Sequence, residues 1–234
     1  MKKLILILLC IISISLYAEN GTEEKKNRDD FNEAYKIFHN HGMNIFDDKI
    51  GDTKLRNDLS ECSNNGNAWC AGLLGEQYYY KEWYSLAYPQ LIKTSKLKED
   101  GWPSFDFHLG YMFSNGLDVL QNDEKALSFF KKSASKGHTD SAINIGDIYY
   151  KRAKLLIRVA NKLEADNITS NLINAYAWYK IAQALNSTQL NNKQLIHIRD
   201  SINVLKQLLA MRSSLNGAND LASQICSTIS TCIQ

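Results

Sequence analysis

Serine followed three residues later by lysine occurs three times in the chain, a spacing that can support attack on a β-lactam ring. On a helix, the lysine then lies one turn away and can activate the serine hydroxyl. The three pairs are Ser95 with Lys98, Ser128 with Lys131, and Ser133 with Lys136. No Ser-Asp-Asn or Lys-Thr-Gly element accompanies them. Because so short a motif recurs by chance, we interpret the pairs as parts of solvated helix faces.

Four cysteines could form disulfides or hold zinc. Seven residues separate Cys62 from Cys70, and five separate Cys226 from Cys232. An even number in close pairs favours two disulfides in an oxidising compartment. A zinc site is the alternative, although the cysteines of zinc knuckles lie only about two to four residues apart.

The remaining polar residues show no recognisable catalytic order. The five histidines are scattered, and the chain has no glycine-rich phosphate loop and no spacing typical of a metal site. We therefore predict no catalytic residue, no metal ligand and no cofactor, and a protein that is not an enzyme.

The N-terminus has the layout of a secretory signal peptide. Lys2 and Lys3 precede an almost purely apolar run over residues 4–16, and Ala18 is a small residue at the cleavage edge. The run is short for a membrane span. We predict removal of residues 1–18 and an exported protein, periplasmic or secreted, with an uncleaved anchor as the alternative.

The charge balance argues against a nucleic-acid partner. The chain has 27 Lys and Arg against 25 Asp and Glu, so without Lys2 and Lys3 both counts are 25. Nucleic-acid binders normally carry a clear basic excess. No second long apolar run follows the first, so we predict no stable membrane span after signal cleavage.

Two interlocked glycine series indicate an internal repeat. Both have intervals of 35 and 36 residues, and the second runs nine residues upstream of the first. The first series is Gly75, Gly110 and Gly146, and the second is Gly66, Gly101 and Gly137. An aromatic residue follows each glycine of the first series three residues later. This period is typical of helical-hairpin repeats.

The clearest unit covers residues 104–137. Phe105, Leu109 and Phe113 share one face of a first helix, as in an amphipathic helix. Gly116 can end that helix, because glycine tolerates the left-handed cap. Asn122 can cap a second helix. The glycines inside first helices allow two helix backbones to approach closely.

The stretch FHLGYMFSNGLDVLQNDEKALSFFKKSASKGHTDSAINIGDIYY resembles the Sel-one-like (Sel1-like) repeat family, close relatives of tetratricopeptide repeats. NAYAWYKIAQALN, over residues 174–186, resembles the second helix of a further unit. When Trp178 and Tyr179 are aligned with Phe129 and Phe130, this further unit has thirteen extra residues, which fall between Tyr149 and Asn174. We interpret them as an insertion that lengthens the first helix of the unit. The resemblance implies an all-α superhelix, or solenoid, of helix-turn-helix repeats.

This resemblance gives a domain organisation. After the signal peptide we expect a disordered linker over residues 19–29 and repeats over residues 30–190. A degenerate N-terminal repeat should precede units near residues 67–101, 104–137 and 139–186. Capping helices should occupy residues 191–234.

The pattern around Gly66 partly resembles the secreted cysteine-rich branch of the family, in which disulfides staple each hairpin junction. The two helices leave the turn antiparallel and close together, so we expect Cys62 to pair with Cys70. We expect Cys226 to pair with Cys232, because the two are close in the sequence and are the two cysteines left over. Some relatives in this branch are described as penicillin-binding, which makes weak β-lactam binding or hydrolysis the alternative function.

Repeat proteins usually bind partners on an extended surface made of equivalent helix positions. In each first helix, positions −2, +1 and +5 from the glycine lie opposite the stripe expected to be buried. We therefore expect partner binding at Leu73, Glu76, Tyr80, His108, Tyr111, Asn144 and Asp147. The predicted function is an exported scaffold that binds another protein, or a cell-wall component, in the cell envelope or at a host.

Two further clusters have both a binding and a structural interpretation. Aromatic residues are dense over residues 78–88, where they can anchor a partner or pack on N-terminal helices. A cationic stripe of Lys151, Lys154, Arg158 and Lys162 can meet an acidic partner or envelope polymer, or simply be a solvated face.

Overall fold

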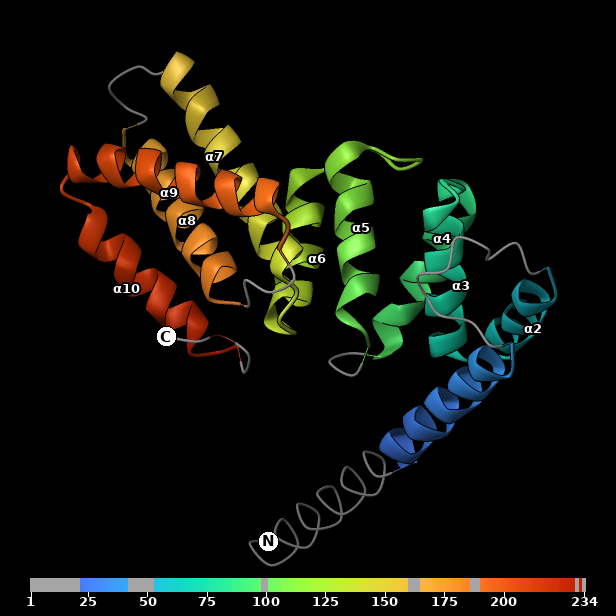
Figure 1. Ribbon diagram of the computed structural model, residues 1–234. Coiled ribbons are helices and arrows are strands. Elements are labelled where there is room, and N and C mark those ends of the chain that lie inside the picture. Colours follow the sequence, from blue (N-terminus) through green and yellow to red (C-terminus); the bar gives the residue numbers. More distant parts are fainter. Residues whose placement is uncertain are drawn as a thin grey trace, which may run out of the picture. The chain divides into compact units, whose positions relative to one another are not determined.

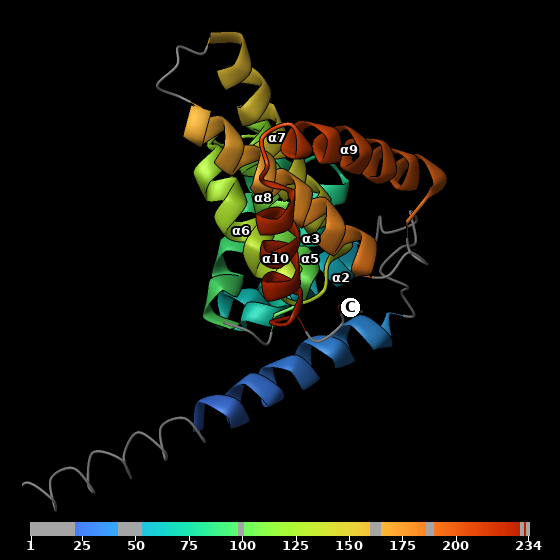
Figure 2. The same cartoon turned by 90° about the vertical axis from the view of Figure 1, so that its left-hand side faces the viewer.

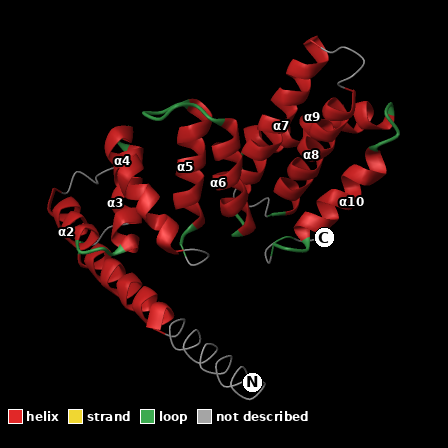
Figure 3. Cartoon of the chain, turned by 180° about the vertical axis from the view of Figure 1, so that it is seen from behind, coloured by secondary structure: helices red, strands yellow, loops and turns green. Residues whose placement is uncertain are grey.

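The computed structural model describes residues 22–41, 53–97, 101–159, 165–185, 190–229 and 232. The regular elements in these residues are helical and none is a strand, so the expected all-α helical-repeat fold is confirmed (Figure 3). None of the helices in this part of the chain combines the length and the hydropathy that a membrane span requires. The predicted signal peptide, residues 1–18, lies outside the described residues.

The chain divides into two compact units, residues 1–101 and 102–234. In the first, a helix over residues 22–40 precedes α2 (Thr53–Asn64), α3 (Ala68–Tyr80), α4 (Tyr84–Leu91) and the 3-10 helix η1 (Ile92–Leu97). The second contains α5 (Pro103–Asn115), α6 (Asp123–Ser135), α7 (Thr139–Val159), α8 (Ala165–Ala184), α9 (Asn192–Ala210) and α10 (Leu215–Cys226) (Figure 1).

The first glycine series marks the crossing of the two helices in each repeat. A Cβ atom at any of these glycines would lie between 2.6 and 3.0 Å from a side chain of the second helix. The contacts join Gly75 to Leu91, Gly110 to Phe130, and Gly146 to Tyr179. Hydrogen in place of a methyl group therefore lets each hairpin close, as the sequence predicted. The alignment of Tyr179 with Phe130 agrees with these contacts.

The thirteen extra residues of the last repeat are shared between its two helices. The helices α5 and α6 have 13 residues each, whereas α7 has 21 and α8 has 20. The sequence predicted that the insertion lengthens the first helix alone. That prediction was only half right, because α8 lengthens by a similar amount and gives the longer α7 a partner to pack on. Ile168 and Leu172, both buried, supply that partner surface on α8.

Two glycines of the second series, Gly66 and Gly137, form turns between repeats. Gly66 and Gly137 have φ values of 94° and 88°, the left-handed conformation that glycine adopts without strain. After each glycine the next backbone N–H reaches back across the turn, from Asn67 to the Cys62 carbonyl and from His138 to the Ser133 carbonyl. This is the hydrogen-bond pattern of the Schellman motif, which ends the helix.

Both ends of the repeat array are covered by helices. The helix over residues 22–40 packs on α3, where the Phe31 and Trp69 rings lie 4.9 Å apart and the Trp69 indole donates to Asn27 at 2.8 Å. The prediction of a disordered linker is thus wrong for residues 22–29, because an amphipathic helix there covers apolar surface of α3. At the other end, α9 and α10 pack on α8 (Figure 2).

Candidate functional site

The predicted binding face is only partly open. Tyr80 and Tyr111 are 54% and 36% exposed, but Leu73, Glu76 and His108 are almost fully buried. The expectation that all these positions face solvent was therefore wrong. A first helix packs against its own partner helix and against neighbouring helices, and in α3 every residue from Ala68 to Gln77 is buried. Partner binding at the predicted positions stays a prediction.

Asn144 and Asp147 are half-buried and already have intramolecular partners. The Asn144 amide donates to the Asp140 carbonyl at 2.7 Å. Asp147 accepts a hydrogen bond from the Tyr179 hydroxyl and lies 2.8 Å from His197 Nε2 of α9. Burial, reinforced by the Asp147 carboxylate, raises the pKa of Tyr179, so this phenol stays protonated and donates. Asp147 therefore joins α7, α8 and α9.

An aromatic surface lies where α3 turns into α4. We define it by Tyr79, Tyr80, Trp83, Tyr84 and Leu86. Its most exposed members, Tyr80, Trp83 and Leu86, have 54%, 46% and 48% of their surface accessible. The Tyr79 ring holds the cluster together, because it makes edge contacts with Tyr80 and Tyr84 at 5.9 and 5.6 Å. The sequence pattern indicated the aromatics but not Leu86.

The turn between α3 and α4 positions this aromatic surface. Glu82 has φ 59°, and the Trp83 N–H donates to the Tyr78 carbonyl at 2.9 Å, which closes a Schellman turn without glycine. The Trp83 ring then lies 6.1 Å from Tyr78, with the Arg56 guanidinium 5.9 Å from its centroid. The turn thus leaves the indole about half exposed, next to Tyr78 and Arg56.

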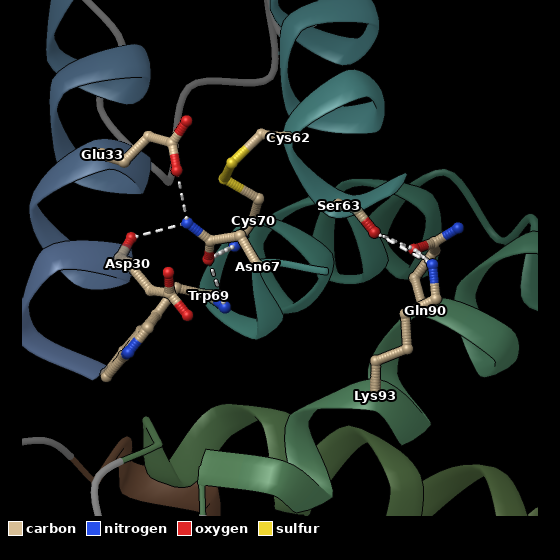
Figure 4. The surroundings of a disulfide bond; sticks show 9 residues. All are labelled: Asp30, Glu33, Cys62, Ser63, Asn67, Trp69, Cys70, Gln90 and Lys93. Atoms are coloured by element: carbon tan, nitrogen blue, oxygen red, sulfur yellow. Dashed lines mark hydrogen bonds between the residues drawn. A yellow bond between two sulfur atoms is a disulfide. The ribbon is translucent and has the colours of Figure 1, made fainter. Parts of the chain in front are cut away.

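A disulfide fixes the junction before α3 (Figure 4). Cys62 at the end of α2 is bonded to Cys70 in the first turns of α3, with 5.9 Å between their Cα atoms. Cys226 is likewise bonded to Cys232, with 5.4 Å between Cα atoms. Both predicted pairs are therefore present, and a four-cysteine zinc site does not form. No group of three metal-ligating side chains exists among the described residues.

Asn67 completes this junction, and the sequence pattern did not single it out. Its side-chain oxygen accepts from the backbone N–H groups of Trp69 and Cys70 at 3.0 and 3.1 Å, which caps α3. Its amide nitrogen donates to the Asp30 carbonyl and the Glu33 carboxylate at 2.8 and 3.0 Å (Figure 4). The pattern Gly-Asn before an apolar helix could have revealed the cap but not the second pair of bonds.

A cleft of about 340 Å³ opens between α8 and α10, beside the second disulfide. Ile181, Ala184, Ala222 and Cys226 form its apolar floor, and Lys180 lies among its polar lining. No sequence pattern indicated this cleft, because it depends on how α10 crosses α8.

Two of the three Ser-x-x-Lys pairs lie wholly within the described residues, and in one of them the serine is buried. Ser133 is fully buried and its hydroxyl donates to the Pro103 carbonyl at 2.7 Å, while Lys136 is paired with Asp106 at 3.0 Å. Ser128 and Lys131 are exposed on α6. Ser95 is exposed on η1, and its partner Lys98 lies outside the described residues.

Comparison with known proteins identifies the repeat. Residues 105–138, the unit α5–α6 with its following turn, match the Sel1 repeat family. No curated protein matches the chain.

A solved structure shares the fold. It is a protective antigen of uropathogenic Escherichia coli strains that displays an SLR (Sel1-like repeat) fold, with a TM-score of 0.57 and 16% sequence identity. The match covers 89% of this chain and 39% of that one, so the chain spans about two fifths of its structural neighbour. At this identity the likeness concerns the fold alone. The chain thus contains a Sel1 repeat over residues 105–138, and its fold is similar to that of a solved Sel1-like repeat structure.

Proposed function

We propose that this repeat protein is an exported scaffold that binds a protein partner through the aromatic surface of its first unit. The exposure of Tyr80, Trp83 and Leu86 within seven residues of chain carries this proposal. Trp and Tyr are the residues that most often dominate the energy of protein interfaces. Adjacent exposed apolar side chains are uncommon unless they have a binding role.

Export is part of the same proposal. The signal-like N-terminus and two disulfides are compatible with an oxidising compartment. The cell envelope is the setting we propose first. Contact with a host is the second, because the structural neighbour is described as a protective antigen. A chain recovered from the envelope fraction should begin at Glu19 on N-terminal sequencing. A chain that still begins at Met1 would instead indicate an uncleaved anchor.

Photo-crosslinking from the aromatic surface tests the binding role. A photoreactive amino acid placed at Trp83 should capture a discrete protein from the native envelope, and mass spectrometry would identify it. The triple variant Tyr80→Ala, Trp83→Ala and Leu86→Ala should abolish co-purification of that protein. Its melting temperature should change little, because all three side chains are about half exposed.

The matched control removes exposed apolar side chains elsewhere. Leu120 and Met211 are 87% and 84% exposed, and their change to Ala should leave capture intact. Equal loss of capture in the control, or full capture by the triple variant, would contradict a role for the aromatic surface. Release of the captured material by a muramidase rather than a protease would point to a cell-wall ligand.

A further inference from the structure

The C-terminal part of α7 carries basic side chains and no acidic ones. The helix is eight residues longer than α5, at 21 against 13, and its end projects past α5 and α6 (Figure 1). Its last carboxylate is Asp147. The cations that follow are Lys151, Arg152, Lys154 and Arg158. This end of α7 thus has a strongly positive surface on a chain whose overall charge is close to neutral.

Three of these four cations are available to an external partner. Arg152 is bonded to Glu124 at 2.9 Å and lies 3.9 Å from Asp123, which ties it to α6. Lys151, Lys154 and Arg158 are exposed, and no carboxylate of the described residues pairs with them. Lys154 rests over the Tyr150 ring at 4.5 Å, which holds its ammonium group at the surface.

Two aliphatic side chains flank the cations. Leu155 and Ile157 are 51% and 46% exposed. At about 100° per residue, the three cations share one arc of the helix, with Leu155 at one border and Ile157 at the other. Ala153 lies on the opposite side and is fully buried. A cation near a helix C-terminus interacts favourably with the helix dipole, but that effect does not account for exposed aliphatic residues beside it.

We propose that this α7 tip, formed by Lys151, Lys154, Leu155, Ile157 and Arg158, binds the surface of an anionic phospholipid bilayer. Such a surface offers phosphate groups to the cations and apolar chains just beneath them to the aliphatic side chains. A soluble polyanion would satisfy the cations but would leave Leu155 and Ile157 in water. The site shares no residue with the aromatic surface, so this proposal does not depend on the proposed scaffold function.

Vesicle flotation with the mature chain tests this assignment. Vesicles of phosphatidylcholine with about one third phosphatidylglycerol should bind the protein, and vesicles of phosphatidylcholine alone should bind it much less. The variant Lys151→Gln, Lys154→Gln, Arg158→Gln should lower the partition coefficient roughly a hundredfold, because each cation contributes about a factor of five at an anionic surface. Added salt should weaken wild-type binding. Wild type and variants are compared in the form that begins at Glu19, because an apolar run retained at residues 4–16 would bind both kinds of vesicle and mask the tip.

A control with the same net charge separates the tip from general attraction. Lys193, Arg199 and Lys206 are exposed on α9, and their change to Gln should leave vesicle binding nearly unchanged. Leu155→Ser with Ile157→Ser should weaken vesicle binding but not binding to dextran sulfate. Circular dichroism confirms folding of each variant. The proposal would be overturned if the tip variant bound vesicles as well as the wild type, or if the control variant lost as much binding. It would also be overturned if the changes at Leu155 and Ile157 left vesicle binding unaltered, and that result would favour a soluble polymer as the ligand.

Discussion

Asn67 joins α3 to the helix over residues 22–40 through one buried amide. It is 4% exposed and makes four hydrogen bonds, two that cap α3 and two that reach the helix over residues 22–40. When a buried polar group loses its hydrogen-bond partners, the loss of folding stability exceeds the stability that a hydrogen bond at the surface contributes. The amide and the neighbouring disulfide therefore act on the same junction, one by hydrogen bonds and the other by a covalent link.

Asn67→Ala should lower the free energy of unfolding by about 2–3 kcal/mol, because a helix cap and a buried link are lost together. Asn122→Ala is the matched comparison. Asn122 also caps a helix, but its side chain makes one cap bond, to the Lys125 N–H at 2.9 Å, at the surface. Its loss should cost about 1 kcal/mol. Urea unfolding measures both, and equal losses would mean that the bonds to Asp30 and Glu33 contribute nothing.

Gly110 has a role that rests on its contact with a single ring, that of Phe130. In Gly110→Ala the new methyl group would meet the Phe130 ring at 2.6 Å, and Phe130 is fully buried with no room to retreat. Overpacking of this kind costs about 1–3 kcal/mol, which outweighs the gain of about 1 kcal/mol in helix propensity. Gly217→Ala in α10 meets nothing within 4 Å and should stabilise the protein. A lower melting temperature for both variants would contradict this explanation.

At the scale of elements, the ends of helices show which turns a sequence reveals. Gly66 and Gly137 occupy left-handed positions and indicate the turn by residue type. Glu82 and Ser213 occupy equivalent positions, with φ of 59° and 54°, in turns closed by the same backward hydrogen bonds. Nothing in their residue types indicates a helix end there, because the packing of the flanking helices imposes the conformation.

Glu82→Gly should therefore stabilise the first unit. Glycine adopts the left-handed conformation without the steric penalty of a Cβ atom, and the gain should be about 0.5–1 kcal/mol after its greater loss of chain entropy. Gly137→Ala makes the reverse change at a turn with φ of 88° and should destabilise by a similar amount or more. Thermal melts followed by circular dichroism measure both changes. A melting temperature lowered by Glu82→Gly would show that the Glu side chain itself stabilises the turn.

At the scale of the molecule, each compact unit contains one disulfide. Cys62–Cys70 lies in the unit of residues 1–101, and Cys226–Cys232 in the unit of residues 102–234. Both close short loops, with sequence separations of 8 and 6. Chain-entropy arguments give about 2–3 kcal/mol for loops of this size. In repeat proteins, stability is roughly a sum of local terms, so each bond should act mainly on its own unit.

Hydrogen exchange resolves this division. Cys62→Ser with Cys70→Ser should accelerate exchange over residues 53–97 and leave residues 165–226 nearly unchanged. Cys226→Ser with Cys232→Ser should do the reverse. Either variant should lower the melting temperature by several degrees and keep its helical signal. Faster exchange throughout the chain in both variants would instead show that the two units unfold as one cooperative body.

The sequence by itself determined the local and periodic features of this protein. Glycine spacing located the helix crossings at Gly75, Gly110 and Gly146, because only a residue without a side chain fits where two backbones meet. Cysteine spacing across Gly66 indicated the first disulfide. These features depend on residues close in the chain or repeated at a fixed interval, so one sequence suffices to read them.

Only the tertiary structure decided which surfaces stay open. Leu73, Glu76 and His108 occupy helix positions that the repeat register assigned to solvent, yet they are buried, because exposure depends on every helix that packs nearby. The bonds from Asn67 to Asp30 and Glu33 span 37 and 34 residues, and no local pattern encodes them. The division of the insertion between α7 and α8 follows the same rule, since two helices lengthen together only when each buries the other's apolar side chains.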